Sequence, residues 1–118
     1  GNDCFFLPGG HIEDGESARG TLLRELNEEL GVNKYKVGEL IGICEHVFPN
    51  GNNEMKHEVN MVFEAKAPKN FRAESIEDHI EFVSIKIEEM RKYNILPKQL
   101  KKGLLEWQKN KELFFKEI

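Results

Sequence analysis

Three glutamates close together in the chain, Glu25, Glu28 and Glu29, have residue types and spacing suited to binding a metal ion. Their i, i+3 and i+4 spacing would place them on one side of a helix, where like charges repel by about 0.2–0.5 kcal/mol per pair. Glu28 and Glu29 would also lie near the C-terminal end of that helix, where the helix dipole disfavours negative charge. A hard divalent cation such as Mg²⁺ would remove this cost. By themselves the glutamates indicate either such a cation site or an ordinary solvated face, with Arg24 as a partial counter-ion.

The helix that must position these glutamates is predicted between Glu16 and Gly31. Ser17 is a suitable N-cap, and Gly31 stands where helices commonly end. At about 100° per residue, four leucines gather in one arc: Leu22, Leu23, Leu26 and Leu30. The glutamates fall in a different arc, away from the leucines. We therefore expect an amphipathic helix that packs through its leucines.

The loop before this helix follows a short apolar run, Phe5 to Leu7, which ends at Pro8 and predicts a strand. The pair Gly9-Gly10 comes next, and glycine allows the backbone to approach a ligand closely. The sequence thus predicts a strand, a glycine loop and a helix in succession.

The spacing over residues 10–32 is specific. Gly10 is followed after five residues by Glu16, and after seven more by the run RELNEELGV, from Arg24 to Val32. In this pattern the chain resembles the Nudix (MutT-like) hydrolases. The motif positions are Gly10, Glu16, Arg24, Glu25, Glu28, Glu29 and Gly31. The resemblance implies an α/β fold, in which a mixed β-sheet is sandwiched between helices and the motif forms a loop–helix–loop element.

The resemblance also implies a reaction, the hydrolysis of a diphosphate linkage in a nucleoside diphosphate joined to another group. A (d)NTP or an ADP-ribose-like compound would be such a substrate. Mg²⁺, or Mn²⁺ in its place, would be held by a carbonyl of Gly9 or Gly10 and by Glu25, Glu28 and Glu29. Such an ion orients the diphosphate and lowers the pKa of an attacking water.

The remaining catalytic roles follow from the same resemblance. Arg24 would pair with a carboxylate and fix its direction, while Glu16 would anchor the loop or touch the metal through water. A carboxylate must also take the proton of the attacking water. Glu77, in the acidic loop over residues 71–79, is the best-placed match to the family. Three other glutamates remain alternatives: Glu74, Glu81 and Glu25.

The chain after the motif predicts a hairpin and a closing helix. Residues 39–48 are apolar on both faces, which is typical of a central strand, and 49–52 read as a hairpin turn. In the return strand, apolar residues alternate with polar ones, broken only by Val62: Val59, Met61, Phe63 and Ala65. A short strand over 81–85 and a helical turn over 87–91 are expected next.

The last helix is predicted to start at Pro97, in position N1. One apolar stripe indicates that it packs on the sheet: Leu100, Leu104, Trp107 and Phe114. Trp107 is interpreted as a core anchor, with stacking on a base as the alternative. The lysines beside the stripe suit either a solvated face or RNA: Lys98, Lys101, Lys102 and Lys109.

Substrate recognition must come from residues outside the motif. The candidates are Phe5, Phe48, His57 and Arg72. Four polar residues of the hairpin are expected to face one another: Glu45, His46, His57 and Glu58. This group leaves a second metal site, a substrate contact and ordinary cross-strand pairs open.

Composition narrows the class of protein. With 118 residues, the chain is expected to form a single domain over residues 1–118. Its net charge of −4 gives no indication of broad nucleic-acid binding, and no apolar run approaches the roughly 20 residues of a membrane span. Cys4 and Cys44 lack zinc or redox spacing, so we interpret both as small buried residues in a reducing, cytoplasmic protein. A turn signal at residues 1–3 predicts an earlier strand before Gly1, and the resemblance implies one or two strands there.

Three functions are compatible with the sequence. The first is an enzyme that acts on a nucleotide-type small molecule, and the intact motif favours it. The second is a non-catalytic Nudix module that binds or senses a nucleotide, which need not keep the charged helix face. The third is an RNA-decapping enzyme that holds RNA on the lysines of the last helix. A homodimer is left open.

Overall fold

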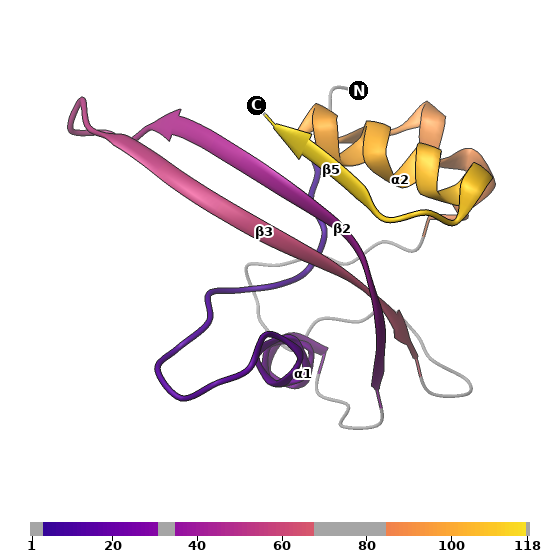
Figure 1. The fold of residues 1–118 in the computed structure, drawn as a ribbon, viewed down its shortest axis with the longest axis horizontal. Coiled ribbons are helices and arrows are strands. Elements are labelled where there is room, and N and C mark those ends of the chain that lie inside the picture. Colours follow the sequence, from indigo (N-terminus) through magenta and orange to yellow (C-terminus); the bar gives the residue numbers. More distant parts are fainter. Residues whose placement is uncertain (1–3, 31–34, 68–84, 118) are drawn as a thin grey trace. The chain divides into compact units, whose positions relative to one another are not determined.

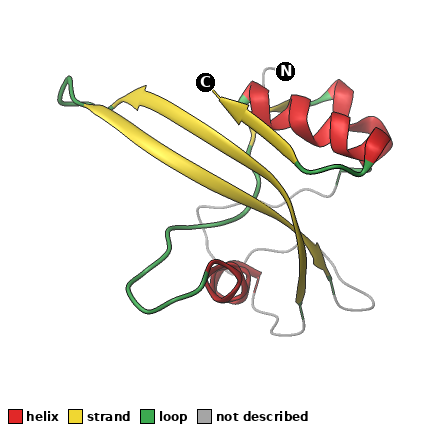
Figure 2. Ribbon diagram, in the orientation of Figure 1, coloured by secondary structure: helices red, strands yellow, loops and turns green. Residues whose placement is uncertain are grey.

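The structure, a computed structural model, describes residues 4–30, 35–67 and 85–117 (Figure 1). Its elements are β1 (Cys4–Phe5), α1 (Ala18–Leu30), β2 (Lys36–Pro49), β3 (Met55–Lys66), the 3₁₀ helix η1 (Ile87–Lys92), β4 (Asn94–Ile95), α2 (Lys98–Asn110) and β5 (Phe114–Glu117). The predicted α/β class is confirmed (Figure 2). Gly31, the acidic loop over 71–79 and nearly all of the strand predicted over 81–85 lie outside the described residues.

The chain divides into two compact units. Unit 1 comprises Gly1–Phe6, Leu40–Val62 and Ile87–Ile118, and unit 2 comprises Leu7–Glu39 and Phe63–Lys86. Unit 1 therefore contains α2 and β5 together with most of the hairpin. Unit 2 contains α1 and the loop that precedes it.

The three-stranded sheet has the order β3-β2-β5, so β2 is the central strand, as predicted. β2 and β3 are joined by a tight loop and run in opposite directions (Figure 1). β5 lies parallel to β2, with Phe114 beside Gly42. The sheet is therefore mixed, as the resemblance implies. β1 and β4 form a separate parallel pair.

The predicted hairpin turn is confirmed, and the side chain of Asn50 organises it. The Asn50 backbone N–H donates to the Glu54 carbonyl at 2.7 Å. The Asn50 Oδ1 accepts from the backbone N–H groups of Asn52 at 2.9 Å and Glu54 at 3.1 Å. Asn53 adopts a left-handed conformation with φ 63°, which asparagine tolerates better than most residues.

The buried side of β3 differs from the prediction. Val59, on the alternating apolar side, is 60% exposed, and Met61 is also exposed. Val62, the residue that breaks the alternation, is buried at 9% and belongs to the core of unit 1. Successive strand residues point to opposite faces, so only one side of β3 can meet that core. That side is the one that carries Val62.

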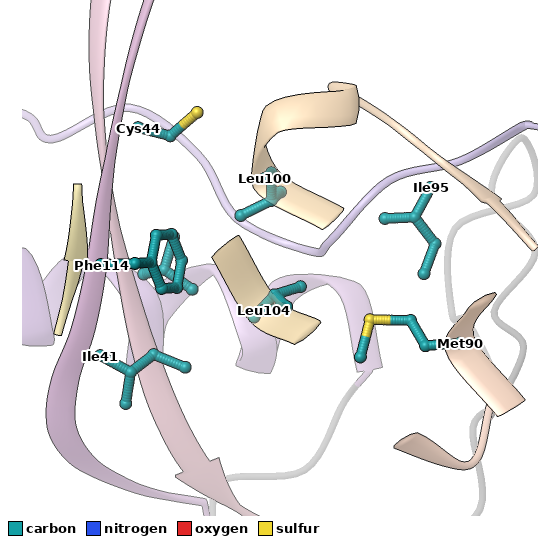
Figure 3. Close-up of a cluster of buried hydrophobic side chains, with 8 residues drawn as sticks. Ile41, Cys44, Met90, Ile95, Leu100, Leu104 and Phe114 are labelled. Carbon is teal, nitrogen blue, oxygen red and sulfur yellow. The ribbon is translucent and has the colours of Figure 1, made fainter. Parts of the chain in front are cut away.

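The core of unit 1 is built around the ring of Phe114 (Figure 3). It combines residues from β2, β3, η1, β4, α2 and β5: Ile41, Cys44, Val62, Met90, Ile95, Leu100, Leu104 and Phe114. Two glycines make room for the ring, because a Cβ atom at either Gly42 or Gly103 would overlap it. The core thus depends on close packing of β2 and α2 around one aromatic side chain.

The last helix is shorter than the apolar stripe predicts. Pro97 is the N-cap rather than N1, and the helix ends at Asn110. Lys111 takes a left-handed conformation and its N–H donates to the Trp107 carbonyl at 2.7 Å, which closes the helix without a glycine. Phe114 lies in β5, so its assignment to the helix is wrong. Trp107 is half-buried and packs against the core cluster.

The two cysteines have different environments. Cys44 is buried at the centre of the core, as predicted, and burial raises the pKa of its thiol. Cys4 is exposed, contrary to the prediction. In the two-residue strand β1, Phe5 packs against the core, so the side chain of Cys4 points the other way. None of the helices in the described parts of the chain has the length and apolarity needed to cross a membrane.

The packing of Phe114 generates a prediction about Gly103. A glycine-to-alanine change inside a helix normally stabilises by about 1 kcal/mol. Here the added methyl group would overlap the Phe114 ring, and we expect Gly103→Ala to destabilise the fold by about 1–3 kcal/mol. Urea unfolding would measure this change. Lys102→Ala, at the exposed neighbouring position, should change stability by less than about 0.5 kcal/mol. A Gly103→Ala variant more stable than the parent would contradict this account of the core.

Candidate active site

The start of α1 is fixed by its N-cap. The Ser17 hydroxyl accepts a hydrogen bond from the backbone N–H of Gly20 at 3.0 Å. The Ser17 carbonyl accepts the first helical hydrogen bond, from the N–H of Thr21 at 2.9 Å. This is the geometry that serine favours at a helix start, and the predicted N-cap is confirmed.

The leucine face of α1 forms the core of unit 2. Leu26 and Leu30 are buried with Tyr35, and Leu22 packs against them. Burial raises the pKa of the Tyr35 hydroxyl. Leu23 is exposed, so its place in the packed arc is wrong. It is the leucine at the margin of the arc, about 100° from Leu22.

Arg24 lies at the centre of the motif and uses its whole guanidinium group. Its Nε donates to Glu16 Oε2 at 2.7 Å and its Nη2 donates to Glu16 Oε1 at 3.0 Å. Nη2 also donates to the His11 carbonyl at 3.3 Å. Nη1 donates to Glu25 at 3.0 Å and to Glu28 at 3.3 Å. All five N–H donors of the side chain are thereby engaged, which a lysine could not reproduce.

Glu16 anchors the loop, one of the two roles that the resemblance implies for it. Besides the two bonds from Arg24, its Oε1 accepts from the Glu13 backbone N–H at 3.0 Å and from the Thr21 hydroxyl at 3.2 Å. The bidentate pair with Arg24, followed by the Glu13 N–H, lowers the pKa of Glu16 from 4.5 to about 2. The same pair raises the pKa of Arg24 further above its usual range. The loop and helix are therefore joined by a charged pair that stays ionised.

The carboxylates of Glu25 and Glu28 are directed at the same atom of Arg24. Both carboxylates accept from the single Nη1 atom of Arg24. Glu28 is 53% exposed, whereas Glu25 is more enclosed. Gly10 lies against the Glu25 carboxylate so closely that a Cβ atom there would overlap it. The glycine loop and the two carboxylates are thus brought together, as the sequence predicts.

Glu29 departs from the predicted arc. It is half-buried, and its Oε2 atom is inaccessible to solvent. Glu29 follows Leu22 by seven residues, or two helical turns, and therefore borders the leucine face. The separation of the glutamates from the leucines is correct for Glu25 and Glu28 and wrong for Glu29.

The donor set of this cluster fits a hard divalent cation. Carboxylate oxygens converge on one point beside the backbone of Gly10. Within residues 4–30, 35–67 and 85–117, no three His, Cys, Asp or Glu side chains already surround a single point. Mg²⁺ does not require such a cage, because it commonly binds through one or two carboxylates, waters and substrate phosphates.

Unit 1 contains most of the residues predicted to contact substrate. Phe5 packs against the core and meets the Tyr93 ring edge-to-face, with centroids 5.6 Å apart. Phe48 lies against the His46 ring at 4.7 Å. His57 Nε2 is 2.5 Å from Glu45 Oε2, an ordinary cross-strand pair. Arg72 lies outside the described residues, as do Glu74, Glu77 and Glu81.

A pocket in unit 1 involves residues that the sequence reasoning missed. It has a volume of about 390 Å³ and is lined by Phe6, His46, Leu96, Pro97, Lys98 and Gln99. The Phe6 ring is 70% exposed. The only sequence signal for this pocket was Phe6, an aromatic residue next to the predicted Phe5. The other lining residues are distant in the chain and come together only in the fold.

A comparison with protein families identifies this arrangement. The NUDIX domain model matches residues 2–108, which is most of the chain. The chain belongs to the Nudix family. Membership supports a general class of activity, hydrolysis of a pyrophosphate bond in a compound that contains a nucleoside diphosphate. Nudix enzymes generally use divalent cations for this reaction.

The lowered pKa of Glu16 predicts how stability depends on pH. Because the folded pKa is about 2 and the ordinary value is 4.5, the ionised pair stabilises the fold fully above pH 4.5. This contribution should be lost progressively as the pH falls from 4.5 toward 2. Over this pH range, the Tm from thermal unfolding should therefore fall more steeply for the parent protein than for Glu16→Gln.

Glu13 provides the matched control for this experiment. Its carboxylate lies 3.9 Å from Arg24 Nη2 and is 71% exposed. Glu13→Gln should keep the pH dependence of the parent protein, because an exposed pair at this distance contributes little. Parallel stability curves for the parent and Glu16→Gln would show that the pair does not stabilise the fold.

Proposed function

We propose that this Nudix protein is an enzyme that hydrolyses a diphosphate linkage in a nucleotide-type small molecule, with Mg²⁺ held by the motif helix. The convergence of Glu25 and Glu28 on one cationic atom beside Gly10 carries the proposal. One guanidinium there contacts the carboxylates of Glu16, Glu25 and Glu28, so a single positive charge meets three negative ones. The surplus negative charge would attract a divalent cation, and it would repel a polyanionic substrate that arrived without one.

The residues of the cluster have separate roles in this proposal. Glu25, Glu28 and Glu29 and a carbonyl of the glycine loop would hold the ion. When bound, Mg²⁺ would neutralise phosphate oxygens and lower the pKa of an attacking water. Arg24 keeps Glu25 and Glu28 directed at one point, and Glu16 keeps Arg24 and the loop in place.

The acceptor of the water's proton remains a prediction. Glu77 is proposed for this role from the resemblance, with Glu74 and Glu81 as alternatives in the same loop. Glu25 is the alternative on α1. It lies next to the proposed ion and is more enclosed than Glu28, and a base must come within hydrogen-bond reach of the reacting water.

The pocket of unit 1 has walls suited to a flat, apolar group. Its walls include an exposed aromatic ring, Phe6, and the imidazole of His46, whose ring is packed against Phe48. Rings of this kind stack on heteroaromatic groups such as nucleobases. Lys98 and Gln99 complete the lining at the start of α2. We propose that this pocket binds a flat heteroaromatic group such as a nucleobase.

The RNA-decapping alternative has less support from the last helix. Lys101, one of the four lysines assigned to RNA, donates its ammonium to the carbonyls of Arg91 at 3.1 Å and Tyr93 at 2.7 Å. It therefore ties α2 to the preceding segment. A lysine held in this way is not available to a phosphate backbone.

A charge-neutral substitution at Glu28 tests the proposed reaction. Glu28→Gln should lower kcat by about 10²-fold or more, because the ion and its water supply several kcal/mol of transition-state stabilisation. Stability without metal should change little, since Glu28 is 53% exposed and like-charge repulsion is relieved. Release of phosphate, pyrophosphate or mononucleotide from a nucleotide panel would be measured with Mg²⁺ and with chelator.

Glu88→Gln, an exposed glutamate of η1, is the matched control and should retain full activity. Turnover of the parent protein should vanish with chelator and return with Mg²⁺ or Mn²⁺. Full turnover in chelator, or near-normal turnover of Glu28→Gln, would reject the proposed metal site. Binding of a nucleotide from the panel without any turnover by the parent protein would favour the binding-module alternative.

The pocket is tested separately through Phe6. Phe6→Ala should weaken the binding of a free nucleoside about tenfold by calorimetry, because stacking of a base on an aromatic side chain contributes about 1–3 kcal/mol. Phe6→Tyr should behave like the parent protein. Leu113→Ala, which removes another exposed apolar side chain of unit 1, is the control. An unchanged affinity for the nucleoside in Phe6→Ala would reject the proposed role of the pocket.

A further inference from the structure

Arg19 occupies an unusual position on α1. It shares the helical spacing i, i+3, i+7 and i+11 with Leu22, Leu26 and Leu30, but its side chain is exposed, whereas Leu26 and Leu30 are buried. The other three positions are filled by leucine. Arg19 places a charged group at the end of this row that is nearest the helix start. It lies outside the motif positions and has no role in the proposed reaction so far.

The guanidinium of Arg19 contacts both strands of the hairpin where they enter unit 2. Its Nη1 donates to the Gly38 carbonyl of β2 at 2.5 Å. Its Cζ atom lies 5.2 Å from the centroid of the Phe63 ring of β3. The first contact is a charge-assisted hydrogen bond and the second is a cation–π interaction. One side chain therefore joins the first turn of α1 to two strands.

The two partners of Arg19 are themselves held together. A Cβ atom at Gly38 would lie 3.2 Å from the Glu64 carbonyl oxygen, tighter than ordinary packing. Glycine thus lets β2 approach β3 closely at this point. Glu64 is next to Phe63 in the chain. The two groups that Arg19 contacts, the Gly38 carbonyl and the Phe63 ring, are therefore held near each other.

The remaining core contacts of α1 are concentrated farther along the helix. The buried side chains of the unit 2 cluster are Leu26, Leu30 and Tyr35, all after Arg24. The capping serine and the loop anchored by Glu16 lie at the other end. In the first turn itself, Thr21 is buried and Arg19 contacts both strands of the hairpin.

We propose that Arg19 is a positioning residue for the carboxylate cluster. By fastening the first turn of α1 to Gly38 and Phe63, it sets the rotation of the helix, and with it the direction of Glu25 and Glu28 relative to Gly10. The expected effect of Arg19 on cation binding rests on the proposed function. Its expected effect on the geometry of the cluster around Arg24 is independent of that function.

The test compares Arg19→Met with Arg91→Met. Both changes remove one positive charge, and Arg91 is exposed on η1 in unit 1. Arg19→Met should weaken Mn²⁺ binding about tenfold by calorimetry, the usual cost of losing a residue that supports metal ligands. It should also lower kcat more than it changes KM. Arg91→Met should change neither quantity, and Arg19→Lys, which keeps the charge and one donor, should restore part of the loss.

A second readout needs no metal. The Nε–H of Arg24 is hydrogen-bonded to Glu16, so its NMR signal reports the geometry of the cluster in the metal-free protein. This signal should shift in Arg19→Met and in Phe63→Leu and stay unchanged in Arg91→Met. An unchanged Arg24 signal in Arg19→Met would overturn the inference, as would a loss of thermal stability with normal Mn²⁺ affinity. If the parent protein binds no Mn²⁺, the proposed function fails, and the Arg24 signal still decides the role of Arg19.

Discussion

The motif of this protein depends on one guanidinium group. Arg24 engages Glu16 in a bidentate pair, holds the His11 carbonyl and directs Glu25 and Glu28 with its remaining donors. A planar group with five fixed donors can satisfy partners from a loop and from a helix at once, whereas an ammonium group acts from a single point. Without it, three carboxylates would repel one another at short range. The lowered pKa of Glu16 is the measurable sign of this arrangement.

The same interaction is compatible with the metal site that we propose. Arg24 contributes one positive charge to a group of three close carboxylates, so the pairing orders the side chains without neutralising them. Residual negative charge on oxygens that point to one place is the requirement of a hard divalent ion. Structural order and the affinity for metal that we propose would therefore arise from the same imbalance of charge. Arg19 extends this principle to the helix as a whole, because its contacts with Gly38 and Phe63 restrict how α1 can turn.

Unit 1 is stabilised by packing rather than by charge. Phe114 fits against Gly42 and Gly103, where no side chain could be added without overlap. This fit lets β5 lie beside β2 and lets α2 cover the core. The start of α2 in turn contributes part of the pocket wall, which is lined by Leu96, Pro97 and their neighbours. A change in the core can therefore alter the pocket without touching its lining.

Local signals in the sequence were sufficient for much of the molecule. The Ser17 cap, the turn at Asn50 and the spacing of the Nudix motif depend on residues near one another in the chain, so they could be predicted directly. The burial of Val62 instead of Val59 could not, because both sides of β3 carry apolar residues and only tertiary packing selects one. Phe114 continued a helical pattern, yet its ring has a place only between two distant glycines. The sequence by itself determined the family and the order of the main elements, while tertiary structure decided which faces are buried and which partners Arg19 and Arg24 reach. The reason is that periodicity and capping act over a few residues, whereas burial and ion pairing depend on segments that meet only after folding.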